Sequence, residues 1–120
     1  MKISLSSKGD NLDSELDPRF GRAQYFIVVD SETKDFKIIR NEQNINARQG
    51  AGIQAAKTII ESGAKVLITK NCGPKAFDVL NAQGIKVAII SKETTIKNAM
   101  EKFLAGELKI ADNANVDGHW

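Results

Sequence analysis

The sequence predicts an α/β domain whose helices pack on a mixed sheet of five strands. Its 120 residues suffice for one hydrophobic core. Two early apolar runs flank a cluster of turn residues, which is typical of an antiparallel hairpin. From residue 65 onward, short apolar runs alternate with segments of helical periodicity. This alternation favours parallel strands joined by right-handed crossovers, and the hairpin adds an antiparallel strand.

The first half of the chain supplies three of the predicted strands. Residues 3–6 alternate apolar and polar side chains and predict the first strand. Residues 8–22 lack periodicity and are rich in Gly, Asp, Ser and Pro, so they predict a long loop, which is uncommon in compact domains and often functional. The apolar runs 25–29 and 36–40, on either side of the turn residues 30–35, predict the hairpin.

The second half supplies three helices and the other two strands, because its apolar residues recur at helical spacing between short buried-type runs. The predicted elements are, in order, a helix that starts near residues 50–52 and ends at Gly63, a strand over 66–68, a helix over 76–80 that is closed by Gly84, a strand over 85–90, and a helix over 96–104 with Thr94 or Thr95 as its N-cap.

The domain is expected to span residues 1–110, followed by a mobile tail over 111–120 that is polar and lacks periodicity. No stretch approaches the roughly 20 apolar residues that a membrane span requires. The start of the chain is too short and too polar for a secretory signal. These features predict a cytoplasmic protein without a membrane partner.

Composition argues against several functional classes. The net charge of +2 comes from 17 basic and 15 acidic residues that are interspersed, whereas nucleic-acid binders gather their basic residues on one face. Single Cys72 excludes an internal disulfide and a multi-cysteine metal cage within one chain. Single His119 excludes a catalytic site that needs two histidines. We therefore expect neither an enzyme nor a nucleic-acid-binding protein.

The turn 69–75 before the second predicted helix contains a candidate ligand. Pro74 suits the first helical position, and Gly73 lets the backbone approach a ligand closely. Cys72 then lies beside the positive end of the helix dipole, with Lys70 and Lys75 near it. Such surroundings are expected to lower the pKa of the thiol and favour the metal-binding thiolate. The alternative, at even odds, is that Cys72 is an inert residue buried at a tight turn.

The long loop offers a candidate clamp for an anion. Arg19 and Arg22 flank Phe20 and Gly21, which suggests two guanidinium groups beside an aromatic wall. In the structural alternative, these arginines pair with the loop acids Asp13, Glu15 or Asp17. The acids Asp10, Asp13, Glu15 and Asp17 also suggest a two-metal nuclease site. They crowd into one loop without a carboxylate on the first strand, and this makes a nuclease the weaker hypothesis.

Two further segments contain candidate ligand-binding residues that can also be explained without a ligand. Gly50 and Gly52 stand at a predicted helix start, where free N–H groups can hold an anion, although close helix packing better explains two glycines considered alone. They belong to neither a Walker loop nor a dinucleotide-binding motif. His119 lies beside Trp120 in the tail and is a metal ligand only if the tail folds back over the site.

Three motifs in this order resemble a known family. Residues 17–23, 50–56 and 71–77 are each similar to a signature of the dinitrogenase iron-molybdenum cofactor biosynthesis family, and residues 118–120 look like a family tail. This family includes the NifX-like and NafY-like nitrogenase cofactor carriers and the C-terminal domain of NifB, the radical enzyme of cofactor assembly. The resemblance covers nearly the whole chain.

The resemblance implies a ribonuclease-H-like three-layer α/β fold with a mixed five-stranded sheet and about three helices. It also implies non-catalytic binding or carriage of an anionic iron-sulfur or iron-molybdenum type cluster, or of its precursor. A cluster donor or acceptor protein would be the partner, and the chain would be a monomer or a weak homodimer. The residues implied in cluster binding are Cys72, Arg19, Arg22, Gly50, Gly52, Asn71, Gly73 and Lys75, and those implied as metal ligands are Cys72 and His119.

A different class of function uses the same residues. A metal-free module that binds an anionic small molecule or a protein partner would need the arginines and the glycine turns, and Cys72 would be incidental. Sequence alone does not separate this module from a cluster carrier.

Overall fold

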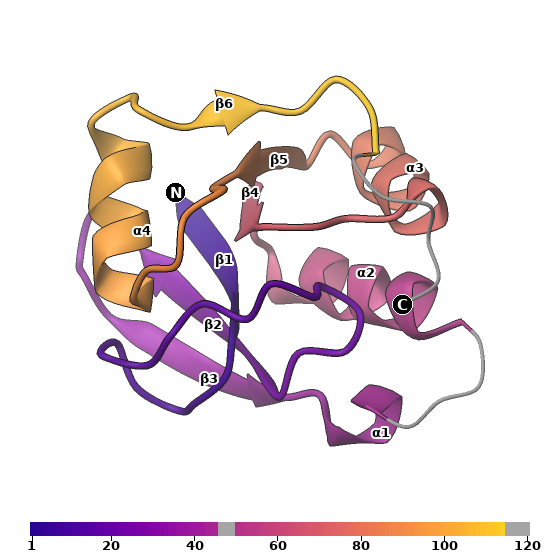
Figure 1. Cartoon of the computed structure of the whole chain (residues 1–120), viewed down its shortest axis with the longest axis horizontal. Coiled ribbons are helices and arrows are strands. Elements are labelled where there is room, and N and C mark those ends of the chain that lie inside the picture. The colour runs from indigo at the N-terminus through magenta and orange to yellow at the C-terminus, as the bar shows by residue number, and fades with distance from the viewer. Residues whose placement is uncertain (46–49, 115–120) are drawn as a thin grey trace.

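A mixed sheet of six strands runs through the middle of the molecule, in the order β3-β2-β1-β4-β5-β6 (Figure 1). The structure is a computed structural model that describes residues 1–45 and 50–114. The strands are β1 Lys2–Ser7, β2 Tyr25–Asp30, β3 Phe36–Arg40, β4 Val66–Thr69, β5 Lys86–Ile89 and β6 Lys109–Ile110. The helices are α1 Glu42–Ile45, α2 Ala51–Ser62, α3 Pro74–Ala82 and α4 Ile96–Leu104.

The strand directions confirm the predicted mixed sheet. β1 pairs in parallel with β4, and β4 pairs in parallel with β5. β2 is antiparallel to both β1 and β3, and this forms the expected hairpin. The carboxyl ends of β1, β4 and β5 therefore meet at one edge of the sheet, where α/β proteins usually bind their ligands.

Helices cover both faces of the sheet and create two hydrophobic clusters. On one face, α2 and α3 pack through Ile59 and Leu80 onto Phe26, Leu67 and other residues of the sheet. On the other face, α4 packs through residues such as Ile96 and Met100 onto β1, β2, β4 and β5, and Leu16 of the loop after β1 joins the same cluster. Figure 1 shows α4 on one side of the sheet and α2 with α3 on the other.

The structure contains one strand and one helix more than the five strands and three helices predicted. β6 has only two residues, both exposed, so it carries no alternation of apolar and polar side chains that sequence could reveal. It forms because Ala88 and Ile89 of β5 offer it an open edge. α1 is a single turn of four residues, too short for a periodic pattern.

Three predicted helix termini are confirmed, one at the end of a helix and two at helix starts. Gly63 ends α2 in the left-handed region with φ of 81°, a conformation that glycine adopts without steric cost. Pro74 occupies the first turn of α3. The hydroxyl of Thr95 accepts a hydrogen bond from the backbone N–H of Asn98 at 3.2 Å, which identifies Thr95, not Thr94, as the N-cap of α4.

The described beginning of the predicted tail is packed. Ala111 donates a backbone hydrogen bond to the carbonyl of Val87 at 2.8 Å, and Ala111 and Ala114 contact the cluster beneath α2 and α3. Residues 115–120, His119 among them, lie outside the described residues, so tail mobility stays a prediction. In residues 1–45 and 50–114, no helix is long and apolar enough to cross a membrane.

Candidate functional site

The loop after β1 returns across the carboxyl ends of β1 and β4 and joins the turn after β4. Arg19 and Asn71 form a parallel bridge. The N–H of Asn71 donates to the carbonyl of Pro18 at 3.0 Å, and the N–H of Phe20 donates to the carbonyl of Asn71 at 3.4 Å. Two of the three sequence motifs are therefore held side by side by backbone hydrogen bonds.

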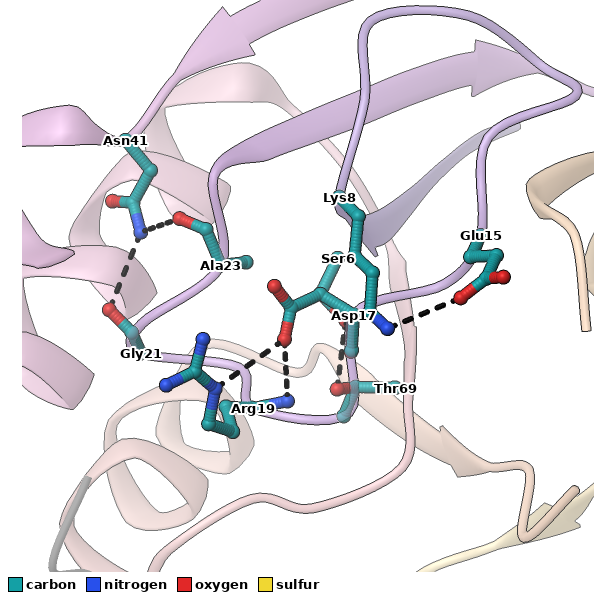
Figure 2. A network of polar contacts seen from close by, with 9 residues as sticks. All are labelled: Ser6, Lys8, Glu15, Asp17, Arg19, Gly21, Ala23, Asn41 and Thr69. Carbon is teal, nitrogen blue, oxygen red and sulfur yellow. Dashed lines mark hydrogen bonds and ion pairs between the residues drawn. The ribbon is translucent and has the colours of Figure 1, made fainter. Parts of the chain in front are cut away.

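Buried hydroxyl groups anchor this loop to the sheet. The Ser6 hydroxyl donates to the carbonyl of Asp17 at 2.7 Å and lies 2.9 Å from the hydroxyl of Thr69 (Figure 2). The Asp17 carboxylate accepts a hydrogen bond from the N–H of Arg19 at 2.9 Å, and the same oxygen lies 3.7 Å from Nε of Arg19. Because the Asp17 side chain is only 5% exposed, it stabilises the loop and offers little surface to a ligand.

The third motif meets the other two through close packing of small residues. An ideal Cβ on Gly21 would lie 2.9 Å from the backbone nitrogen of Gly52 and 3.2 Å from the backbone carbonyl carbon of Ala51. A Cβ on Gly52 would lie 3.4 Å from the Cβ of Ala76 in the first turn of α3. The loop after β1 and the starts of α2 and α3 therefore converge, as the order of the motifs along the parallel strands predicts.

Two helices begin at this point without side-chain caps. Gly50 and Gly73 are the N-cap residues of α2 and α3, and neither has a side chain that could accept hydrogen bonds from the first N–H groups. By contrast, Thr95 caps α4 on the other face of the sheet. The uncapped amides and the positive ends of two helix dipoles favour an anion. Lys75, exposed in the first turn of α3, and Arg19, with 48% of its side chain exposed, add positive charge to this edge.

Arg22 lies in a different environment from Arg19. Its Nη1 donates to the carbonyls of Asn44 and Ile45, at 3.1 and 3.2 Å, at the end of α1. The alternative in which Arg22 pairs with Asp13, Glu15 or Asp17 is not confirmed: within the described residues, its guanidinium binds the carbonyls at the end of α1. The Arg19 alternative is confirmed in part, since Arg19 lies beside Asp17.

A buried asparagine pair holds the glycine of the first motif in position. Nδ2 of Asn41 donates to the carbonyls of Gly21 and Ala23, at 3.2 and 2.8 Å (Figure 2). Its Oδ1 accepts a hydrogen bond from Asn44 at 2.7 Å. Sequence reasoning missed both asparagines, although an Asn directly after a strand and before a helical turn is a capping signal.

Cys72 and Phe20 are core residues. The Cys72 side chain is 1% exposed, and burial raises the pKa of its thiol to about 12. The predicted lowering of this pKa is therefore wrong: desolvation by the surrounding apolar side chains disfavours the thiolate and outweighs the helix dipole. Phe20 is also 1% exposed and packs on Phe26 with ring centroids 5.3 Å apart, so it is no aromatic wall for a ligand.

We expect the Cys72 thiol to be unreactive in the folded protein. With a pKa near 12, the thiolate is about one part in ten thousand at pH 8, and the side chain is also inaccessible. Reaction with a chromogenic disulfide reagent at pH 8 should be at least about a hundredfold slower in buffer than in denaturant. Equal rates under both conditions would mean that the turn around Cys72 opens readily.

The acidic residues do not assemble into a metal site. Glu15 pairs with Lys8 at 3.1 Å (Figure 2), whereas Asp17 lies beside Arg19. Within residues 1–45 and 50–114, no group of three or more His, Cys, Asp and Glu side chains is arranged to hold a metal ion. Neither a two-metal nuclease site nor a complete cluster cage can therefore be built from the described side chains as they stand.

Comparison with known proteins agrees with the motifs. The sequence model of the dinitrogenase iron-molybdenum cofactor family matches residues 1–106. The chain belongs to this family. It is 36% identical over 112 residues to an uncharacterized protein of Methanocaldococcus jannaschii, a match that covers 91% of this chain and 90% of the relative.

Two solved structures resemble the chain along its length. The apo form of the orange protein from Desulfovibrio gigas is 41% identical, with a TM-score of 0.93 and 96% of each chain covered. A putative NifB protein from Thermotoga is 30% identical, with a TM-score of 0.84 and 98% of each chain covered. The family resemblance read from the three motifs is thereby confirmed.

Proposed function

We propose that this family member binds and carries an anionic metal-sulfur cluster, of the iron-sulfur or iron-molybdenum type or a precursor, as cargo and without catalysing a reaction. The observation that carries the proposal is the meeting of three family motifs where two helices start without side-chain caps. Membership of the dinitrogenase iron-molybdenum cofactor family supports a metal-sulfur cluster as the class of cargo. The similarity to an orange protein solved in its apo form also supports a carrier.

In this proposal, charge and hydrogen bonds hold the cargo. Backbone N–H groups after Gly50 and Gly73 and the dipoles of α2 and α3 face the anion. Arg19 and Lys75 supply positive charge at the same edge, and both side chains are exposed enough to move. The remaining proposed contributors are Gly52, Asn71 and Arg22.

Direct ligation by Cys72 needs a change in the turn that buries it. A metal ligand must be a thiolate in contact with the cluster, and the Cys72 thiol is inaccessible and has a raised pKa. We therefore propose that Cys72 supports the turn in the cargo-free protein and becomes a ligand only if the turn opens. His119, outside the described residues, stays a second proposed ligand.

One specific observation favours the metal-free alternative. The burial of Cys72 leaves the site with cationic groups and backbone donors, which suit an anionic small molecule or an acidic segment of a partner protein equally well. The two candidates differ in one measurable property, the metal content of the loaded protein.

The deciding experiment is anaerobic reconstitution with an iron-sulfur cluster source, followed by determination of bound iron and visible absorbance. We expect bound cluster in the wild type and in Cys72→Ala. The double variant Arg19→Gln with Lys75→Gln should bind at least about tenfold more weakly, because two charges near the anion are lost. The matched control, Lys86→Gln with Lys97→Gln, removes two exposed lysines elsewhere and should bind as the wild type does.

Each contrary result has its own meaning. If the wild type takes up no metal, the carrier proposal is overturned and the metal-free module is the better hypothesis. If Cys72→Ala folds normally but takes up no metal, the cluster is ligated by the thiolate and retention by charge alone is wrong. Equal losses in both double variants would point to the net charge of the protein and not to this edge.

The proposal also includes a partner, a cellular location and a fold type. A cluster donor or acceptor protein would be the partner, and a cytoplasmic location would suit this exchange. We also infer a ribonuclease-H-like arrangement for β1–β5, supported by the antiparallel β2 beside parallel β1, β4 and β5 and by helices on both faces.

A further inference from the structure

A groove lies at the edge of the sheet opposite the candidate functional site. It is formed by the amino end of β1, where the N label stands in Figure 1, by the hairpin turn between β2 and β3, and by the end of α2. Its volume is about 270 Å³, just below the roughly 300–1,000 Å³ of pockets for drug-sized ligands. The residues that line it include Lys2, Val28, Asp30, Asp35, Phe36 and Lys37.

We propose that this groove binds a free α-amino acid with an apolar side chain, such as leucine or methionine. The two lysines face the carboxylate of the ligand, the two aspartates face its ammonium group, and the apolar residues contact its side chain. The inference is independent of the proposed cargo, because the groove shares no residue with the edge at which the three family motifs meet.

The strand register brings charges of both signs together in the groove. Lys2 pairs with Asp30 across β1 and β2, and Val28 pairs with Lys37 across β2 and β3. The backbone N–H of Asp30 donates to the carbonyl of Asp35 at 2.9 Å, so the two aspartates are neighbours across the hairpin. A ligand that carries one positive and one negative group is therefore complementary to this lining, whereas a simple anion or cation meets like charges.

The charged groups of the groove have capacity for a ligand. No ion pair between described residues involves Lys2, Lys37 or Asp35. Asp30 is partly engaged, because its Oδ1 accepts hydrogen bonds from two N–H groups of the hairpin turn, at 2.9 and 3.3 Å. These bonds, the amino group of Met1 and Lys2 lower the pKa of Asp30. Asp30 is thus already balanced in part, and Asp35 is the main partner for the ammonium group of the ligand.

Val28 and Phe36 supply the apolar surface of the groove. Val28 is 5% exposed but belongs to neither hydrophobic cluster of the described residues, so no helix cluster accounts for its burial. Phe36 is 46% exposed. A ligand side chain that covers part of this surface removes apolar area from water, which favours binding by about 25 cal/mol per Å². Amino acids without an apolar side chain lose this contribution, so selectivity for apolar ones is expected.

Titration of the isotope-labelled full chain with L-leucine, up to about 10 mM and followed by backbone amide chemical shifts, tests this inference. We expect saturable shifts in residues 28–37 and at the end of α2. Three analogues each lack one group: N-acetyl-L-leucine lacks the ammonium, 3-methylbutylamine lacks the carboxylate, and glycine lacks the side chain. Each should bind at least about fivefold more weakly than leucine.

Two variants test the roles of the charged residues. Asp35→Asn and Lys37→Gln should each weaken leucine binding by at least about fivefold, because each removes one charged partner. In Asp35→Asn, the preference for leucine over N-acetyl-L-leucine should also fall, since the carboxylate that pairs with the ammonium is gone. The matched controls Asp112→Asn and Lys97→Gln change exposed residues of the same types outside the groove and should bind leucine as the wild type does.

Three results would overturn the inference. The first is a wild type without shifts at about 10 mM leucine. The second is binding of leucine and all three analogues with equal strength, because the groove would then not recognise the two charges. The third is a set of shifts in residues 16–22 and 71–76 instead of the groove. None of these measurements involves a metal, so their failure is distinguishable from failure of the cluster proposal.

Discussion

Replacing Gly21 with alanine is expected to lower the free energy of unfolding by about 2–3 kcal/mol and to abolish cargo binding. The added Cβ would lie 2.9 Å from the nitrogen and 3.0 Å from the Cα of Gly52, and both are backbone atoms of α2. No flexible side chain can yield at this contact, so the loop after β1 or the start of α2 must move. Thermal and denaturant unfolding measure the first effect, and metal content after reconstitution measures the second.

Gly52→Ala is the matched control for the stability measurement. Its Cβ would lie 3.4 Å from the Cβ of Ala76, an ordinary van der Waals contact, and alanine favours the helix more than glycine does. We expect its stability to stay within about 1 kcal/mol of the wild type. If Gly21→Ala were as stable as Gly52→Ala, the loop would have to be free to shift, and the convergence of the three motifs would not depend on this contact.

Asn41→Ala is expected to cost about 3 kcal/mol of stability. The substitution removes the donor that serves the carbonyls of Gly21 and Ala23 and the acceptor that serves Asn44, and Asn41 is fully buried. Several buried polar groups would lose their hydrogen-bond partner at once, and each would stay desolvated without a compensating bond, which lowers the free energy of unfolding. Equilibrium unfolding in urea measures the loss.

A comparison with two other asparagines separates this network from general effects. Asn98→Ala changes an exposed residue on α4 and should alter stability by less than about 0.5 kcal/mol. Asn44→Ala removes one hydrogen bond to Asn41 and should give an intermediate loss. If Asn41→Ala and Asn98→Ala were equally stable, the hydrogen bonds to the glycine loop would contribute nothing net.

The regular elements of the fold could be predicted because their signals are local. The apolar runs at 25–29 and 36–40 lie within or match β2 and β3, and Gly63 and Pro74 mark helix ends through backbone requirements that need no tertiary context. β6 could not be predicted, since its two exposed residues become a strand only because β5 presents an open edge.

For the candidate site too, one feature could be predicted from the sequence and another could not. The meeting of residues 17–23, 50–56 and 71–77 follows from their positions at the carboxyl ends of parallel strands and at helix starts, and the structure brings them together. The state of the Cys72 thiol did not follow from its neighbours in sequence. The glycine, proline and lysines beside it suggested a lowered pKa, whereas packing within the α2–α3 cluster raises it.

The sequence by itself determined the α/β class, the family and the motifs that converge, because periodicity, turn residues and motif order are properties of short segments. Only the tertiary structure decided what each side chain contacts: Phe20 and Cys72 became core, Arg22 bound the carbonyls of α1, and Asn41 secured Gly21. These outcomes depend on which distant segments cover a residue. Desolvation and hydrogen bonding are set by those neighbours in space, and a local sequence pattern does not contain them.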